Sequence, residues 1–502
     1  MARRTAALLA GFTVALTLAA GCSPNLRWVS PTSGAAPSAP SASGPSVGTV
    51  AWQDCTDTAS GILPRLAPNT EYDCGSIQVP QDWKAPQNGD KFDIALMRVR
   101  NRNQTDRIGS LIVNPGGPGG SGIEIAAYLS LELPGDILNR FDVVGFDPRG
   151  VGRSSPAIKC FANSDMDKAF GLDPDPVKMA DFNTLASLWQ KMGNDCQQKY
   201  GAELPLFSTE QSARDMDAIR AAVGDQKISY LGFSYGTLLG AVYAQLFPKN
   251  IRALVLDGAV DPTLAPVDAA EGQAQGFEHA FDEFAAWCKQ NTASCPIAPN
   301  ARAAVNAAMQ QARTAPVANS DGRKATAGWV LTGITEALYS QQLWPVMATA
   351  VAALRRGNAK AIMELADEYA QRGPNGQYGN MFDAFDTISC DDDASGETVA
   401  LARQKQLDWR AKYPLFGGSL GTGILSCAAW PAKRDPFPTG KAKGAPPMVV
   451  VGTINDPATP YTNTARLANM LGNSTVVTWQ GEGHTAYPQT SCIRATIDAY
   501  LI

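Results

Sequence analysis

The chain contains only two histidines, His279 and His484, so a reaction that needs an imidazole base has almost no choice of residue. His484 lies in a glycine-rich segment at 481–485 (GEGHT), directly after an apolar run at 475–479 that predicts a strand. A histidine in such a loop can reach over the carboxyl edge of a sheet. His279 lies inside a helical pattern at 272–290, where we interpret it as a histidine on the surface or lining of a helix. His484 is therefore the candidate base.

The pattern Gly-x-Ser-x-Gly supplies a candidate nucleophile, because a sharp turn from a strand into a helix exposes a serine hydroxyl above a sheet. The pattern occurs at 44–48 (GPSVG), 232–236 (GFSYG) and 417–421 (GGSLG). Only the second copy follows a predicted strand and opens a predicted helix. Its glycines leave room for the tight turn, and Ser234 would stand beside the positive end of the following helix.

A serine–histidine pair needs a carboxylate that orients the imidazole and stabilises its charged form. Asp456 follows a predicted strand in the segment 455–460 (NDPATP), where two prolines stiffen the loop. Asp257, after an earlier predicted strand, is the competing candidate and ranks behind Asp456. The order Ser234, Asp456, His484 along the chain is that of α/β-hydrolases, and we predict that these residues form a catalytic triad.

An acyl-transfer site also needs donors aimed at the oxyanion. The glycine-rich segment 114–122 (NPGGPGGSG) directly follows a predicted strand, so its backbone can approach a substrate closely. Nucleotide phosphate is the competing ligand, but the P-loop pattern is absent and the prolines remove donors. We expect the N–H groups of Gly117 and Tyr235 to form the oxyanion hole.

Short apolar runs predict the strands that would carry these residues. Continuous runs of this kind are typical of strands covered on both faces, as in a parallel sheet. Helical patterns at 213–223 and 235–246 flank one run, which is the βαβ rhythm of an α/β fold. The predicted strands are residues 93–99, 110–114, 141–146, 228–232, 253–257 and 448–452.

This rhythm stops between 261 and 445, where amphipathic patterns such as 272–290 and 343–371 prevail, and it resumes at Met448. We therefore predict an α/β-hydrolase fold with a mostly parallel sheet and a large, mainly helical cap insertion. A separate C-terminal domain is the alternative. The predicted parts are a signal peptide with a lipobox (1–22), a disordered tether (23–48), the first part of the core (49–260), the cap (261–445) and the second part of the core (446–502).

The N-terminal residues predict export. Arg3 and Arg4 precede an apolar stretch at 6–18, which is too short to span a bilayer, and small residues lead to Cys22. This ending resembles a bacterial lipobox, so we expect Cys22 to be lipidated and to anchor the protein to the outer side of the cytoplasmic membrane. Simple cleavage with release is the alternative. The Ser/Pro/Ala/Gly-rich tract that follows predicts a flexible tether.

Cysteine usage agrees with an oxidising compartment, because the ten cysteines are widely scattered and contain no Cys-x-x-Cys pair. Proximity in the sequence alone predicts four disulfides, with Cys492 left over if Cys22 is lipidated. Without lipidation the number of cysteines is even. The predicted pairs are Cys55–Cys74, Cys160–Cys196, Cys288–Cys295 and Cys390–Cys427.

Composition excludes some functions. Hydrophobic residues make up 45% of the chain, which is enough for a large core. The net charge of −5 gives no basic field for a phosphate backbone, so we expect no nucleic-acid partner. Two distant histidines offer no zinc-ligand set, and we expect no metal and no cofactor. The oligomeric state is open.

Four motifs in order resemble those of the secreted tripeptidyl-aminopeptidase-like α/β-hydrolases, relatives of proline iminopeptidase that include cell-envelope lipoproteins. The resemblance covers nearly everything after the tether. It implies that Ser234, Asp456 and His484 are the triad, with a helical cap over the site. The motifs are 114–119 (NPGGPG), 146–154 (FDPRGVGRS), 232–237 (GFSYGT) and 456–460 (DPATP).

The resemblance also implies two supporting residues. Thr459 is expected close to the triad, and Asp392, in the segment 390–393 (CDDD), is expected to bind the substrate's α-ammonium group. An exposed acidic loop is the alternative for that segment. The oxyanion loop begins with Asn-Pro where proline iminopeptidases have histidine, so strict proline specificity is not predicted.

Three functions remain open at this point. The first is an exported serine exopeptidase that releases short peptides, often tripeptides, from free N-termini through an acyl-enzyme. The second is a carboxylesterase or lipase with the same machinery, because a triad does not distinguish an ester from an amide. The third is a non-catalytic lipoprotein that binds peptides or envelope polymers.

Overall fold

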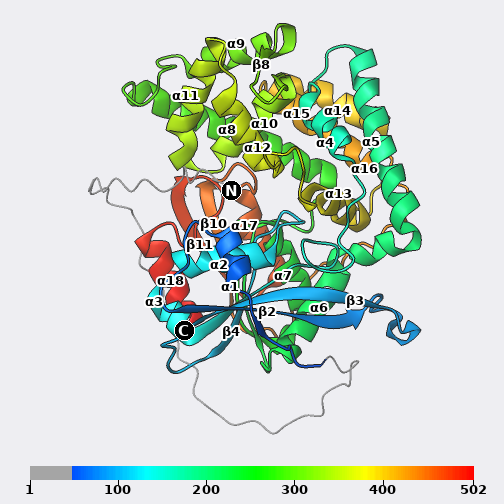
Figure 1. Cartoon of the computed structure of the whole chain (residues 1–502), viewed down its shortest axis with the longest axis vertical. Coiled ribbons are helices and arrows are strands. Elements are labelled where there is room, and N and C mark those ends of the chain that lie inside the picture. The colour runs from blue at the N-terminus through cyan, green and yellow to red at the C-terminus, as the bar shows by residue number, and fades with distance from the viewer. Residues whose placement is uncertain (1–47) are drawn as a thin grey trace.

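A computed structural model describes residues 48–502 (Figure 1). The expected signal peptide and nearly all of the expected tether lie outside these residues. Two short strands, β8 (Val317–Ala318) and β9 (Lys324–Ala325), form a separate antiparallel pair. The other nine strands form one sheet in the order β1-β2-β3-β5-β4-β6-β7-β10-β11. They are β1 (Gln53–Asp54), β2 (Thr70–Pro80), β3 (Lys91–Asn101), β4 (Gly109–Asn114), β5 (Phe141–Phe146), β6 (Ile228–Phe233), β7 (Ile251–Asp257), β10 (Met448–Asn455) and β11 (Ser474–Glu482).

The sheet has a parallel part and an antiparallel edge. All neighbours from β5 to β11 pair in parallel, which confirms the predicted α/β fold. The predicted strand at 93–99 is correct in place, but β3 runs antiparallel to both of its neighbours. It forms a hairpin with β2, and a short connection between paired strands forces the antiparallel direction. The sequence did not predict β2, because its polar and apolar residues alternate and form no continuous apolar run.

Helices cover both faces of the sheet. On one face, α2 (Gly122–Glu132), α3 (Gly135–Arg140) and α18 (Ser491–Leu501) pack on side chains such as Leu111 and Val113. The other face carries α6 (Thr209–Ala222), α7 (Tyr235–Leu246) and α17 (Thr462–Leu471), which pack on side chains such as Ile112. Because successive residues of a strand point to opposite faces, the continuous apolar runs supply two cores at once.

The predicted helical insertion lies between β7 and β10 and forms a cap on one side of the core (Figure 1). The pattern at 343–371 is two helices, because Gly357 takes a left-handed conformation with φ +88° between them. The cap helices are α8 (Pro266–Gln290), α9 (Ala301–Thr314), α10 (Ala327–Leu338), α11 (Trp344–Arg355), α12 (Lys360–Ala370), α13 (Met381–Asp392), α14 (Val399–Lys412), α15 (Gly417–Gly423) and α16 (Leu425–Ala428).

A second, earlier segment packs with this insertion. The helices α4 (Asn163–Gly171) and α5 (Met179–Tyr200) lie beside α14, α15 and α16 in Figure 1. Their buried residues, including Met166, Leu188 and Met192, belong to the same apolar cluster as those of α8 to α12. The sequence predicted this segment (within 49–260) as part of the core, so the cap is larger than expected and is built from two separate stretches of chain.

The four predicted disulfides are confirmed as Cys55–Cys74, Cys160–Cys196, Cys288–Cys295 and Cys390–Cys427. No cysteine is free among residues 48–502, so Cys492 is not left over. Across the same residues, no helix combines the length and the apolar character that a bilayer span requires.

Candidate active site

Ser234 occupies a strained turn between β6 and α7. Its φ of 55° and ψ of −125° lie outside the regions that residues with a side chain normally adopt. The glycines around it are required by close backbone contacts. A Cβ on Gly236 would stand 2.9 Å from the carbonyl oxygen of Asn114, and one on Gly232 would collide with the Gly236 carbonyl. This is the geometry of a nucleophile elbow, and it leaves Ser234 partly exposed.

The imidazole of His484 is bonded to the carboxylate of Asp456. His484 Nδ1 lies 2.9 Å from Asp456 Oδ1 and 3.0 Å from Oδ2. Because a carboxylate only accepts, Nδ1 must carry the proton, and Nε2 is then free to act as a base. The backbone N–H of His484 donates to the carbonyl oxygen of Tyr339 at 2.8 Å, so a cap residue helps to fix the loop.

Asp456 is itself held firmly. It is 3% exposed, and its carboxylate accepts hydrogen bonds from the backbone N–H groups of Ala458, Thr459 and Thr485 at 2.8–3.2 Å. The hydroxyl of Thr459 donates to Asp456 Oδ2 at 3.0 Å and lies 3.3 Å from His484 Nδ1. Thr459 therefore stands where the family resemblance implied. These donors fix the carboxylate in one orientation.

Electrostatics favour a positive charge on the imidazole. Burial alone would lower the pKa of His484, but the charge and hydrogen bond of Asp456 and the charge of Asp257 raise it above its ordinary value. A base that must hold a proton during the reaction gains from this arrangement, because the imidazolium is stabilised.

The glycine-rich loop after β4 presses against the elbow. A Cβ on Gly116 would lie 2.9 Å from both the Cβ of Ser234 and the backbone nitrogen of Tyr235. In residues 48–502 no group accepts a hydrogen bond from the N–H of Gly117 or of Tyr235. Tyr235 is the first residue of α7, where helix N–H groups lack internal partners. Both predicted oxyanion donors are therefore free of internal acceptors, as an oxyanion hole requires.

Asp257, the competing carboxylate, does not contact the imidazole. Its side chain is fully buried and accepts from the backbone N–H groups of Ala486 and Tyr487 at 2.7–3.0 Å, just after His484. Its backbone carbonyl accepts from the N–H of Ser234 at 2.8 Å. Burial, with a contribution from the charge of Asp456, raises the pKa of Asp257 to about 6. One residue thus ties the nucleophile to the histidine loop.

Asp392 lies close to the elbow through one intermediate residue. Its two carboxylate oxygens accept from the backbone N–H and hydroxyl of Thr209 at 2.9 and 2.6 Å. The same hydroxyl is bonded to the phenol of Tyr235, which follows the nucleophile. Asp392 is partly exposed, and burial raises its pKa to about 7 against the lowering effect of Thr209. The alternative of a fully exposed acidic loop is therefore wrong.

The sequence is similar to known proteins over most of the chain. Residues 109–342 match the family described as alpha/beta hydrolase fold, and residues 413–502 match the family described as TAP-like protein. The serine protease Hip1 of Mycobacterium tuberculosis (strain ATCC 25618 / H37Rv) is 37% identical over 445 residues, which cover 86% of this chain and 85% of that protein.

The chain belongs to the tripeptidyl-aminopeptidase-like α/β-hydrolases. It is a serine hydrolase. The tripeptidyl aminopeptidase of Streptomyces coelicolor (strain ATCC BAA-471 / A3(2) / M145) is 30% identical over 460 residues, covering 90% of this chain and 83% of that protein. A protein of Mycobacterium tuberculosis (strain ATCC 25618 / H37Rv) named carboxylesterase B is 35% identical over 448 residues, covering 86% and 84%. Relatives in this family thus carry the names of peptidases and of esterases.

His279 and Ser419, the other histidine and the serine of another Gly-x-Ser-x-Gly copy, make no contact with the triad residues. His279 is exposed on α8, where its Nε2 lies 2.9 Å from Asn455 Oδ1. Ser419, in the third Gly-x-Ser-x-Gly copy, lies within the cap helix α15 rather than at a strand-to-helix turn. The copy at 44–48 falls almost entirely outside the described residues.

The motif at 146–154 stabilises the loops around the site through buried hydrogen bonds. Asp147 is buried and accepts from the hydroxyl of Ser121 at 2.6 Å, which fixes the end of the oxyanion loop. Arg149 is fully buried and forms two hydrogen bonds of 2.6 and 2.8 Å with Asp215. These residues hold loops together, and removing one partner of such a buried pair is strongly destabilising.

Aromatic residues of the cap face the triad, and the sequence analysis did not identify them. The ring of Tyr339 meets that of His484 edge-on, with the centroids 5.3 Å apart. Tyr339 also contacts Tyr369, which contacts Phe382. The residues come from three cap helices or their ends, so no local spacing could have grouped them. Through Tyr339, this row of aromatic rings reaches the imidazole of His484.

Proposed function

We propose that this hydrolase is an exported serine exopeptidase that releases short peptides, typically tripeptides, from free N-termini. The observation that carries the proposal is the position of Asp392, a partly exposed carboxylate joined to the elbow residue Tyr235 through Thr209. A carboxylate connected to the elbow in this way suits a substrate that carries an ammonium group. The names of the relatives from Mycobacterium and Streptomyces support a peptidase.

The reaction would proceed through an acyl-enzyme. His484 Nε2 takes the proton of Ser234 as its oxygen attacks the substrate carbonyl, and Asp456 stabilises the resulting imidazolium. The N–H groups of Gly117 and Tyr235 stabilise the tetrahedral oxyanion. The C–N bond then breaks, and His484 gives the proton to the leaving amine. Water, activated in the same way, releases the acyl segment and restores Ser234.

Asp392 gives this binding mode a pH dependence. Its pKa of about 7 means that the anion forms as the pH rises through neutrality. A peptide α-amine loses its charge at a pKa of about 7.7–8.0. The attraction between the two groups is therefore greatest between pH about 7 and 8 and weakens on either side.

An esterase is the second candidate function. The aromatic surface of Tyr339, Tyr369 and Phe382 would accept an apolar acyl group, and the relative named carboxylesterase B shares the fold and length. An esterase of this kind would have no use for a free amine on its substrate.

A mixture of free and N-acetylated peptides separates the two functions. Native protein and the Ser234→Ala variant are incubated with the mixture, and the fragments are identified by mass. Ladders of N-terminal tripeptides from the free peptides alone support the exopeptidase. Internal cleavage of blocked peptides, or hydrolysis of esters without hydrolysis of peptides, contradicts it.

We also propose that Cys22 carries a lipid and holds the enzyme on the outer side of the cytoplasmic membrane. The support is the lipobox-like sequence alone, since Cys22 lies outside the described residues. The disulfide-bonded state of Cys492 is the observation against it, because the other eight cysteines of residues 48–502 pair with one another. Mass spectrometry of the mature N-terminus is the test. Acylated Cys22 is the expected result, and an unmodified or disulfide-linked Cys22 would contradict the anchor.

A further inference from the structure

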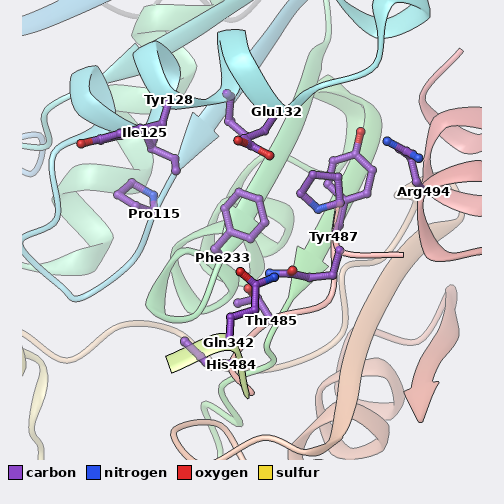
Figure 2. Close-up of a pocket in the computed structure, with 13 residues that line it drawn as sticks. Pro115, Ile125, Tyr128, Glu132, Phe233, Gln342, His484, Thr485, Tyr487 and Arg494 are labelled. Carbon is purple, nitrogen blue, oxygen red and sulfur yellow. The ribbon is translucent and has the colours of Figure 1, made fainter. Parts of the chain in front are cut away.

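A cavity of about 610 Å³ opens beside the histidine of the triad (Figure 2). It is lined on one side by His484 and Thr485. The other side is lined by Phe233, the residue before Ser234, and by Pro115, near the start of the glycine-rich loop. Its volume lies within the range of about 300–1,000 Å³ that is usual for ligand sites. Apart from His484, the residues that line this cavity have no role in the proposed reaction.

The chemistry of the triad places the leaving segment of a substrate on the side of the site where His484 lies. His484 must pass its proton to the leaving nitrogen, so that nitrogen has to lie on the imidazole's side of Ser234. The acyl half lies on the other side, where Tyr235, Thr209 and Asp392 form a connected chain of hydrogen bonds. An extended substrate that crosses Ser234 from Asp392 therefore enters the cavity with its leaving segment.

The lining is suited to an apolar side chain. Pro115, Ile125 and Phe233 group together at one end of the cavity, while Tyr487 and Arg494 stand at the other (Figure 2). Gln342, from the short helical turn Gln341–Leu343, adds a cap residue to the wall. Apolar groups thus gather at the end formed by Pro115, Ile125 and Phe233, and the exposed charged side chains of Glu132 and Arg494 also line the cavity. The first residue of a leaving segment would meet the apolar end.

We propose that this cavity is the leaving-group subsite, and that it binds the peptide segment released by cleavage, preferably one that begins with an apolar residue. The inference rests on the proposed acyl-enzyme mechanism. It implies that an amine bound in the cavity can attack the acyl-enzyme in place of water. In that step the amine nitrogen bonds to the acyl carbon, the ester bond to Ser234 breaks, and His484 carries the amine's proton to the serine oxygen.

Competition between water and added amines tests the subsite directly. The acyl-enzyme is formed from a tripeptide ester, and leucinamide, phenylalaninamide or glycinamide is added at equal concentration. The ratio of tetrapeptide amide to free tripeptide is measured by mass. We expect the two apolar amides to give ratios at least about fivefold above that of glycinamide, equivalent to about 1 kcal/mol of selective binding.

Two variants alter the cavity at positions that the fold tolerates. Ile125 is only partly buried, and Ile125→Glu should reduce the ratio for leucinamide to that of glycinamide. Gln342 is exposed, and Gln342→Trp should fill the space and lower the ratio for the bulky amides most. The matched control is Val346→Glu, an exposed apolar position on α11 that does not line the cavity, which should keep the native ratios.

The outcomes separate this inference from the proposed function. Turnover of the ester with identical ratios for all three amides, in the native enzyme and in both variants, overturns the subsite and leaves the acyl-enzyme standing. A protein that neither turns over the ester nor forms an adduct with a fluorophosphonate probe overturns the proposed function, and the subsite with it.

Discussion

The carboxylates at the sheet edge and those in the cap of this hydrolase are held very differently. Asp456 accepts hydrogen bonds from three backbone N–H groups, a hydroxyl and an imidazole. The carboxylate of Glu336, on the cap helix α10, accepts no hydrogen bond from residues 48–502, and burial together with the charge of Glu368 raises its pKa to about 7. Asp392 has the single partner residue Thr209. Many donors fix the geometry of the reacting groups, whereas few donors leave cap carboxylates that titrate near neutral pH.

The largest effect is expected at the nucleophile itself. Ser234→Ala should lower kcat by about 10⁶-fold, because no other hydroxyl occupies the elbow. Turnover and fluorophosphonate labelling measure the loss, and circular dichroism checks the fold. Ser419→Ala, in the cap copy of the same sequence pattern, is the matched control and should keep native activity. If both variants are active, the reacting serine has been misassigned.

The second-largest loss of activity is expected for Asp456, the carboxylate that accepts many hydrogen bonds. Asp456→Asn should lower kcat by about 10⁴-fold, since an amide stabilises the wrong tautomer of His484 and cannot balance its charge. Activity needs a neutral imidazole, so in the native enzyme kcat/KM falls as the pH drops through the raised pKa of His484. The residual activity of the variant should fall only at lower pH. A pH profile that keeps its acid limb would contradict the pairing.

Asp257 offers a sharper test because it touches neither the substrate nor the imidazole. Asp257→Asn should lower kcat by about 10²-fold through a small displacement of the histidine loop, with less change in KM. Loss of its charge should also move the acid limb of kcat/KM to lower pH, which a purely structural defect would not do. Asp225→Asn is the control, since that carboxylate accepts from the N–H of Ser110 at the opposite end of the sheet.

A smaller effect is expected for the cap carboxylate. Asp392→Asn should raise KM for peptides with a free N-terminus by about 10-fold, equivalent to about 1.4 kcal/mol, and lower kcat by less. The rise in affinity between pH 6 and 7 that we expect for the native enzyme should be absent in the variant, because the titrating group is gone. Asp408→Asn, an exposed position on α14, serves as control. An unchanged KM would remove Asp392 from the substrate site.

The smallest effect is expected at Thr459. Thr459→Val removes one of several donors to Asp456, at a cost of about 0.5–1.5 kcal/mol, so kcat should fall by about three- to tenfold. The backbone N–H of Thr459 remains, and the carboxylate keeps most of its hydrogen bonds. A loss as large as that of Asp456→Asn would mean that the hydroxyl does more than orient the carboxylate.

Local patterns correctly predicted the elements that carry the candidate residues. The strands before Ser234 and Asp456 are apolar runs, and the loops after them have the glycines and prolines that sharp turns require. His484 could be chosen because only one other histidine exists. The oxyanion loop followed from the same logic, and the disulfides followed from proximity along the chain.

The rest depends on contacts between distant parts of the chain. Nothing in the residues around Asp257 indicates that its carboxylate holds the backbone after His484, since the partners are main-chain groups far along the sequence. The edge-on contact of Tyr339 with His484 likewise joins a cap helix to a core loop. The place of α4 and α5 in the cap was missed because amphipathic helices look alike wherever they pack.

The two-part construction of the cap limits how it can be exchanged. A graft of residues 261–445 onto a related core would leave behind α4 and α5, whose apolar side chains match the old cap and not the new one. The mismatched surface would invite aggregation before any change in substrate choice could be measured. New specificities in this family should therefore be sought by transferring both stretches as a pair.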